Sequence, residues 1–238
     1  SAIVKLKLQL LGDFFIDLLE FLQAQKLQVY PVLPRSSNKK TSNSSIRLDM
    51  IERDRILKAV KKDYLIVGGV LDNICNSACQ SCDEDLSTKI GSLKGKHYKR
   101  INNYENFWQL PLERIVELDI NGGEPTASPN YKKLLRNLPE SVKIVRINTN
   151  VSRMIPEVEI LLQRGIRVII TLSFDGTGIV HDYVRWPIKW TAYESNVARY
   201  VELREKYDKL RLNCWTTVSC LNIADFDNIL TFTEENNL

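Results

Sequence analysis

From residue 64 onward, the chain alternates short apolar runs with stretches of helical periodicity. The runs are rich in Val, Ile and Leu, which is typical of strands covered on both faces. They cover residues 64–71, 115–121, 143–149, 166–173 and 210–218. Helical patterns lie near residues 102–110, 129–137, 155–164 and 191–207, and a further apparent helix covers 224–236. This alternation predicts an α/β fold with parallel strands and right-handed crossovers.

The chain before residue 64 follows a different pattern. Leucine and phenylalanine repeat at helical spacing across residues 8–27, opposite an acidic face. Pro31 and Pro34 end this segment, and a polar stretch rich in serine, asparagine and lysine comes next. A charge-rich helical pattern at 48–62 then leads to the first strand. We expect an N-terminal helical extension over 1–34, a flexible linker over 35–47 and the main domain over 48–238.

Composition is ordinary for a globular protein. Of 238 residues, 44% are hydrophobic and 26% are charged, which suits one large α/β domain. The net charge of +4 is mild and evenly spread, so it gives no clear nucleic-acid signal. No run of about 18 apolar residues occurs, and we expect no membrane span. The clustered cysteines suit a reducing compartment, which predicts a cytoplasmic protein.

Three of the five cysteines follow the first apolar run, in Cys75-Asn-Ser-Ala-Cys79-Gln-Ser-Cys82. A zinc site normally needs four protein ligands, and the next candidate is His97. A 4Fe–4S cluster can use three thiolates and leave one iron open. The spacing alone leaves three alternatives: an iron–sulfur cluster, zinc with His97, and a disulfide or an accident of composition.

Other polar motifs follow the later strands. Asn121-Gly-Gly-Glu-Pro125 ends the second run, Asn148 closes the third, and Ser173-Phe-Asp-Gly176 closes the fourth. Parallel α/β sheets bind ligands at the carboxyl ends of their strands, so these motifs should lie near the cysteines. Glycine pairs let backbone approach a ligand closely. Ser173 and Asp175, two residues apart, should point the same way toward a ribose or a carboxylate.

The Cys-x3-Cys-x2-Cys, Gly-Gly-Glu-Pro and Ser-x-Asp-Gly motifs, in this order, resemble the radical S-adenosylmethionine (radical SAM) enzymes. The resemblance covers roughly residues 64 to 233. It implies a partial (β/α)6 barrel, with five units visible and a sixth strand beyond Leu238. One position departs: many members carry an aromatic residue before the third cysteine, beside the adenine, and here it is Ser81.

The resemblance also implies cofactors and their ligands. Cys75, Cys79 and Cys82 would hold a 4Fe–4S cluster, which reductively cleaves S-adenosyl-L-methionine to a 5′-deoxyadenosyl radical that abstracts hydrogen from a substrate. Arg185 is the best candidate to pair the cofactor carboxylate bidentately. The implied cofactor-binding residues are Gly122, Gly123, Glu124, Pro125, Asn148, Ser173, Asp175 and Arg185.

The motif variants look most like the members with C-terminal SPASM or twitch extensions, which hold auxiliary clusters. The resemblance therefore implies a missing C-terminal part and favours a peptide or protein substrate. It also implies an electron donor such as flavodoxin or ferredoxin.

Two other functions are compatible with the residues alone. One is a non-catalytic zinc- or iron–sulfur-stabilised binding module. The other is a nucleotide-binding α/β protein whose cysteines are incidental.

Overall fold

A computed structural model describes residues 64–95 and 99–238. The predicted N-terminal extension, the linker, the helix at 48–62 and His97 lie outside the described residues. The domain boundaries drawn from the sequence therefore stay predictions.

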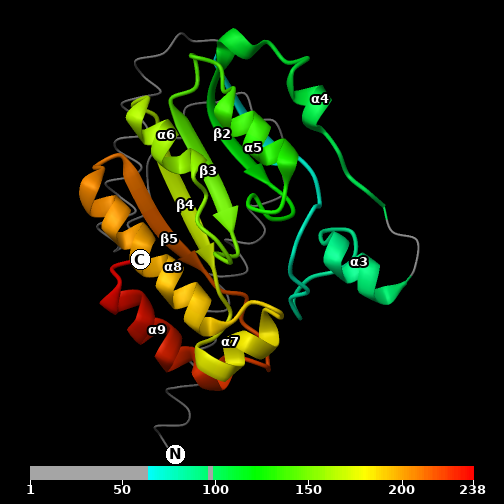
Figure 1. Ribbon diagram of the computed structural model, residues 1–238, viewed down its shortest axis with the longest axis vertical. Coiled ribbons are helices and arrows are strands. Elements are labelled where there is room, and N and C mark those ends of the chain that lie inside the picture. The colour runs from blue at the N-terminus through cyan, green and yellow to red at the C-terminus, as the bar shows by residue number, and fades with distance from the viewer. Residues whose placement is uncertain (1–63, 96–98) are drawn as a thin grey trace, which may run out of the picture. The chain divides into compact units, whose positions relative to one another are not determined.

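The five predicted strands form one sheet, and their order in the sheet is their order in the sequence (Figure 1). The strands are β1 (Leu65–Val70), β2 (Ile115–Asn121), β3 (Ile144–Thr149), β4 (Arg167–Ser173) and β5 (Leu210–Trp215). All four neighbouring pairs are parallel. The predicted α/β fold with five units of a partial barrel is confirmed.

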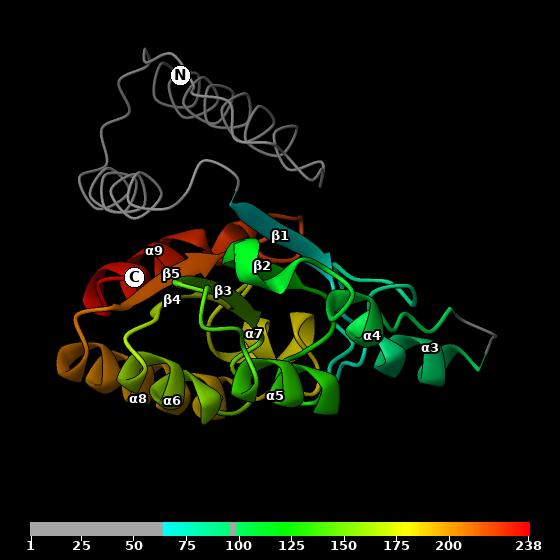
Figure 2. The same ribbon diagram turned by 90° about the horizontal axis from the view of Figure 1, so that it is seen from above.

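Helices α5 (Pro129–Arg136), α6 (Glu157–Gln163) and α8 (Trp190–Lys206) cover one side of the sheet (Figure 2). α5 begins at Ser128, whose Oγ accepts a hydrogen bond from the Tyr131 N–H at 3.0 Å, with Pro129 in the first turn. The helix-facing side chains of the strands are apolar and buried; they include Val145, Ile147, Val168, Ile170, Leu172 and Leu210. Within the described part of the chain, no helix combines the length and hydropathy of a membrane-spanning segment.

The opposite face of the sheet is largely polar, although it also carries the buried Ile115, Ile144 and Ile169. Because successive strand residues point to opposite faces, this face carries Glu117, Asp119, Asn121, Arg146, Asn148, Thr171, Ser173, Arg211 and Asn213. Arg146 Nε donates to Glu117 Oε1 at 2.7 Å from the neighbouring strand. The register aligns Asn148 with Thr171, and Thr171 with Asn213. One face of the sheet therefore builds the core, and the other presents hydrogen-bonding groups.

Several elements differ from the sequence prediction. The seven-residue helices α3 (Thr88–Lys94) and α7 (Gly178–Val184) had no predicted counterpart, since two turns are too short for a clear period. The predicted helix over 102–110 is only α4 (Tyr104–Phe107), followed by η1 (Leu112–Arg114). The last helix is α9 (Phe226–Glu235), preceded by η2 (Ile223–Asp225).

Strand β5 also ends earlier than predicted, at Trp215 and not at residue 218. Thr216 Oγ1 donates to the Phe174 carbonyl at 2.8 Å, and the Thr217 N–H donates to Asp175 Oδ1 at 2.7 Å. These bonds turn the end of β5 toward the loop after β4.

We expect Ile170→Ala to lower the free energy of unfolding by about 2–5 kcal/mol, because Ile170 is fully buried in the core at β4 and its truncation leaves a cavity. Ile179→Ala is the matched control, since Ile179 is 85% exposed and should change stability by less than about 0.5 kcal/mol. Urea unfolding followed by circular dichroism measures both. Equal losses in the two variants would contradict the assigned core.

Candidate metal and cofactor site

The cysteine loop, residues 75–82, directly follows the end of β1. Two buried residues, Asp72 and Asn73, fix its start. Asp72 Oδ1 accepts from the Ile74 N–H at 3.1 Å, and its Oδ2 accepts from Ser128 Oγ at 2.6 Å. Asn73 Nδ2 donates to the carbonyls of Asp85 at 2.9 Å and Lys99 at 2.8 Å. The loop is therefore tied both to the start of α5 and to the chain on either side of α3.

Ser77 lies between the first two cysteines. Its Oγ is 3.3 Å from Cys75 Sγ and 3.6 Å from Cys79 Sγ. Ser77 is only 2% exposed, and Asn150 Nδ2 donates to the same hydroxyl at 3.2 Å. Ser87 Oγ donates to the Ser77 carbonyl at 2.7 Å. One small side chain thus connects two thiols with the loop after β3.

All five cysteines lie among the described residues, and each is a free thiol. The disulfide alternative for the Cys75–Cys82 loop therefore does not hold in this structure. Burial raises the pKa of the Cys75 thiol and raises that of Cys82 to about 11. A thiolate is costly in such surroundings unless a cation compensates its charge. A bound positive centre would therefore be needed to keep these groups as thiolates.

Within residues 64–95 and 99–238, no three His, Cys, Asp or Glu side chains are grouped to hold a single metal ion. A 4Fe–4S cluster makes a different demand, because each thiolate ligates a different iron. Three free, partly buried thiols in one anchored loop fit that group. The donor set is also purely sulfur, which suits an iron–sulfur cluster.

Gly122 and Gly123 lie against the cysteine loop. A Cβ on Gly123 would stand 2.0 Å from the Ile74 carbonyl oxygen, and one on Gly122 would stand 2.3 Å from that of Asp72. The Glu124 N–H donates to the Ile74 carbonyl at 2.7 Å. The sequence prediction was that these glycines admit a ligand. In the structure, the close approach that requires glycine is made by the protein's own loop.

Glu124 is 1% exposed and holds the next loop in place. Its Oε1 accepts hydrogen bonds from the N–H and Oγ1 of Thr126 and from Thr149 Oγ1, at 2.8–3.1 Å. Its Oε2 accepts from the Asn150 N–H at 2.7 Å. Burial raises the pKa of this carboxyl, although the hydrogen bonds act in the opposite direction. Pro125, the next residue, is also buried.

Asp175 and Arg185 form a buried ion pair beside the cysteine loop. Arg185 Nη1 is 3.3 Å from Asp175 Oδ2 and 3.8 Å from Cys79 Sγ. Ser81, the residue that departs from the family pattern, donates to Asp175 Oδ2 at 3.4 Å. Ser173 lies half-buried at the end of β4, whereas Asp175 is fully enclosed. The two residues therefore occupy different environments.

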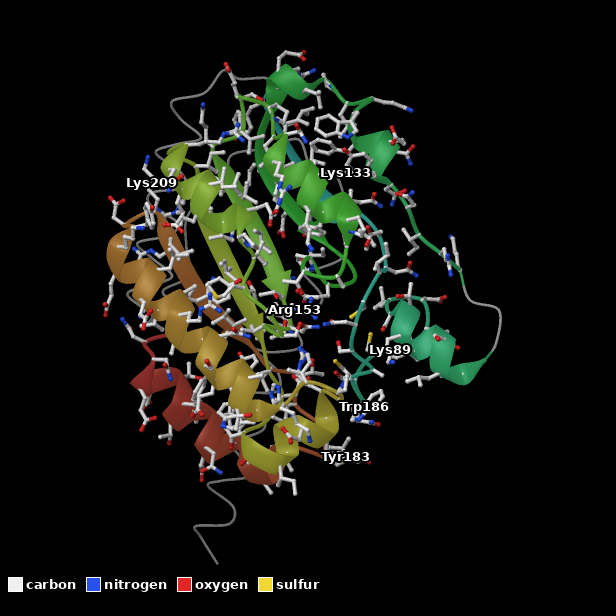
Figure 3. The ribbon with its side chains drawn as sticks, viewed as in Figure 1. Lys89, Lys133, Arg153, Tyr183, Trp186 and Lys209 are labelled. Atoms are coloured by element: carbon white, nitrogen blue, oxygen red, sulfur yellow. The ribbon has the colours of Figure 1, made fainter. Side chains whose placement is uncertain are left out.

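Trp186 and Lys89 mark the outer rim of the cysteine loop (Figure 3). Lys89 Nζ lies 5.5 Å from the centroid of the Trp186 ring, which joins α3 to the connection between α7 and α8. The Trp186 carbonyl accepts from the Ala78 N–H at 2.7 Å. Trp190, by contrast, packs in the core against Phe232.

Neither a family model nor a curated protein matches the chain. Solved structures do. SuiB of Streptococcus suis, bound to precursor peptide SuiA, matches with a TM-score of 0.51 and 16% identity over 97% of this chain and 51% of that one. Histidine-tagged anSMEcpe with bound AdoMet matches with a TM-score of 0.51 and 18% identity over 72% of this chain and 47% of that one.

Both of these proteins are radical SAM enzymes. The chain has the radical SAM fold. It spans about half the length of each of these two proteins. Within the radical SAM fold, the cysteine loop, Gly122 to Pro125, and the Asp175–Arg185 pair meet at the carboxyl ends of β1, β2 and β4. Asn148 donates to Asn121 Oδ1 and is exposed on the polar face.

Sequence reasoning missed part of the site. Ser77 occupies a variable position inside the cysteine motif, so no spacing distinguishes it. Asn150 caps the turn that follows β3, because its Oδ1 accepts from the Ser152 N–H at 3.0 Å. It also connects Glu124 with Asn76 and Ser77 of the cysteine loop. His181 is buried in α7, where burial lowers its pKa to about 4.

We expect Ser77→Ala to lower the free energy of unfolding of the metal-free protein by about 1–3 kcal/mol, because Asn150 Nδ2 and two thiols lose a buried partner. Ser92→Ala, on the exposed side of α3, should leave the free energy of unfolding nearly unchanged. Urea titration under reducing conditions compares the two. Indistinguishable midpoints would show that the Ser77 hydroxyl does not stabilise the loop.

Proposed function

We propose that the protein is a radical SAM enzyme whose cluster is held by Cys75, Cys79 and Cys82. The observation that carries the proposal is the anchored loop of three free thiols at the carboxyl end of β1, on a fold shared with two radical SAM enzymes. When bound, the cluster and S-adenosylmethionine supply a 5′-deoxyadenosyl radical that removes hydrogen from a substrate.

The chain's own residues bind and orient these groups. Glu124 Oε1 is fully used by Thr126 and Thr149, but Oε2 accepts only from Asn150 among the bonds described above. A carboxylate oxygen has two lone pairs, so Oε2 retains capacity for the cofactor's amino group. The Gly122–Gly123 backbone and Pro125 hold this carboxylate against the cysteine loop. Asn148, Ser173 and Asp175 would line the cofactor from β3 and β4.

We expect Cys79→Ala to abolish or strongly reduce the electron paramagnetic resonance signal of the anaerobically reconstituted, reduced protein, because a cluster with three protein ligands does not survive the loss of one. Iron and sulfide analysis should fall in parallel. Cys220→Ala removes an exposed thiol outside the loop and should retain the signal. An undiminished signal in Cys79→Ala contradicts the ligand assignment.

Glu124→Ala should weaken S-adenosylmethionine binding by about tenfold or more, since a charge-assisted hydrogen bond contributes roughly 1.5–3 kcal/mol. Calorimetric titration of the reconstituted protein measures the affinity, and iron content confirms that the cluster is retained. Glu194→Ala, on the exposed side of α8, is the control and should bind as the parent does. Equal affinity in Glu124→Ala and parent would assign Glu124 a purely structural role.

The substrate proposed for this site is a peptide or protein. Support comes from the row of Asn121, Asn148, Thr171 and Asn213 on the polar face, whose amide and hydroxyl groups match the donors and acceptors of a polypeptide. SuiB, with the same fold, is bound to a precursor peptide. A synthetic peptide library that raises 5′-deoxyadenosine release above the peptide-free rate would support this substrate class. A rise with small metabolites alone would oppose it.

The remaining partners are proposed on chemical grounds. Radical SAM chemistry needs a one-electron donor such as flavodoxin or ferredoxin, and free thiols suit the cytoplasm. The SPASM or twitch assignment stays a prediction of the motifs.

The alternative function is a non-catalytic module stabilised by zinc or a cluster. Bound zinc without sulfide, or a loaded cluster that never yields 5′-deoxyadenosine with dithionite, would favour that alternative.

A further inference from the structure

A short segment after α7 runs beside the cysteine loop in the opposite direction. The Ala78 N–H donates to the Trp186 carbonyl at 2.7 Å, and the Gln80 N–H donates to the Val184 carbonyl at 2.8 Å. Cys79 lies between the two donors of these bonds, and Arg185 lies between the two acceptors. The backbone itself therefore sets Arg185 opposite Cys79.

The Arg185 guanidinium is aimed at the Cys79 sulfur. Nη1 lies 3.8 Å from Sγ, within the range of a hydrogen bond to sulfur, and the side chain is 10% exposed. The Arg185 N–H also donates to the His181 carbonyl at 2.9 Å, which fixes the residue at the end of α7. A permanent positive charge thus lies at a thiol that we assign as a cluster ligand.

Asp175 supplies the opposite charge at the same guanidinium nitrogen, Nη1. Its Oδ2 is 3.3 Å from Arg185 Nη1 and accepts from Ser81 Oγ at 3.4 Å. Its Oδ1 accepts from the Thr217 N–H at 2.7 Å. The carboxylate is 1% exposed and is held by three elements, so it keeps the arginine in one orientation. Arg185 Nη1 is thus shared between the Cys79 sulfur and the Asp175 carboxylate.

We propose that Arg185 and Asp175 tune the reduction potential of the iron–sulfur cluster, Arg185 raising it and Asp175 lowering it. The inference rests on the proposed cluster at Cys75, Cys79 and Cys82. Reduction adds one electron, and so one negative charge, to the cluster. A nearby cation and an N–H···S hydrogen bond favour that added charge, and a nearby anion opposes it. Screening is weak because both side chains are buried.

This role is separate from the pairing of Arg185 with the cofactor carboxylate that the resemblance implies. The Cys79 contact exists without any cofactor, so its effect on the potential appears before S-adenosylmethionine is added. Carboxylate pairing alone predicts a change in cofactor affinity and no change in the potential of the cofactor-free cluster.

The test is a redox titration of the anaerobically reconstituted protein without S-adenosylmethionine, using dithionite as reductant and electron paramagnetic resonance as readout. Arg185→Ala should shift the midpoint to a more negative potential than the parent's. Asp175→Asn should shift it to a more positive potential, because the guanidinium is then uncompensated. Arg185→Lys keeps the charge and should lie nearer the parent. Lys189→Ala removes an exposed positive charge four residues along the chain and should leave the midpoint unchanged.

Shifts of opposite sign in Arg185→Ala and Asp175→Asn support the proposal. Midpoints equal to the parent's, or shifts of the same sign, overturn it. If Arg185→Ala fails to hold a cluster, a positive shift in Asp175→Asn together with a midpoint near the parent's in Arg185→Lys supports the proposal. Absence of a positive shift in Asp175→Asn overturns it. Failure of the proposed function looks different, because then the parent protein itself binds no iron and sulfide.

Discussion

The site depends on the absence of a side chain at Gly123. Its Cα faces the Ile74 carbonyl so closely that any Cβ would overlap the backbone, and the next residue hydrogen-bonds to that carbonyl. This contact joins the loop after β1 to the loop after β2. The three thiols and the Gly-Gly-Glu-Pro segment are therefore connected through the backbone as one unit.

Polar side chains extend this unit to the third strand. Glu124 accepts from the Asn150 N–H, and the Asn150 amide in turn donates to Asn76 and Ser77 between the cysteines. Each bond is buried or partly buried, so losing any one leaves a polar group without its partner. The chain thereby couples the residues assigned to S-adenosylmethionine with those assigned to the cluster, before either group is bound.

Elements that depend on a local sequence pattern were predicted, whereas contacts between residues far apart in the sequence were missed. The strands were found because each is a short apolar run covered on one face by helices and continued in register by its neighbours. Helices α3 and α7 were missed because seven residues give too little periodicity. The cysteines were found by their spacing, but the partners of Cys79 were not: Arg185 is 106 positions away, and no pattern links them. The contact of Gly123 with the loop after β1 was missed for the same reason, since the backbone that it accommodates is 49 positions away in sequence (123 − 74).

The two faces of the sheet explain how contacts between residues far apart in the sequence are held in a fixed position. On one face, fully buried side chains such as Val168 and Ile170 pack against the helices and fix the strands with little freedom. The other face is then free to carry groups that weaken a core, including the Glu117–Arg146 ion pair between β2 and β3. A buried ion pair is poor evidence for stability, because desolvation offsets most of its attraction. What such pairs add is orientation, and the Asp175–Arg185 pair, at the rim of the same face, orients a charge toward a sulfur atom. The apolar face thus provides the stability that lets the polar face carry ion pairs and hydrogen-bonding groups.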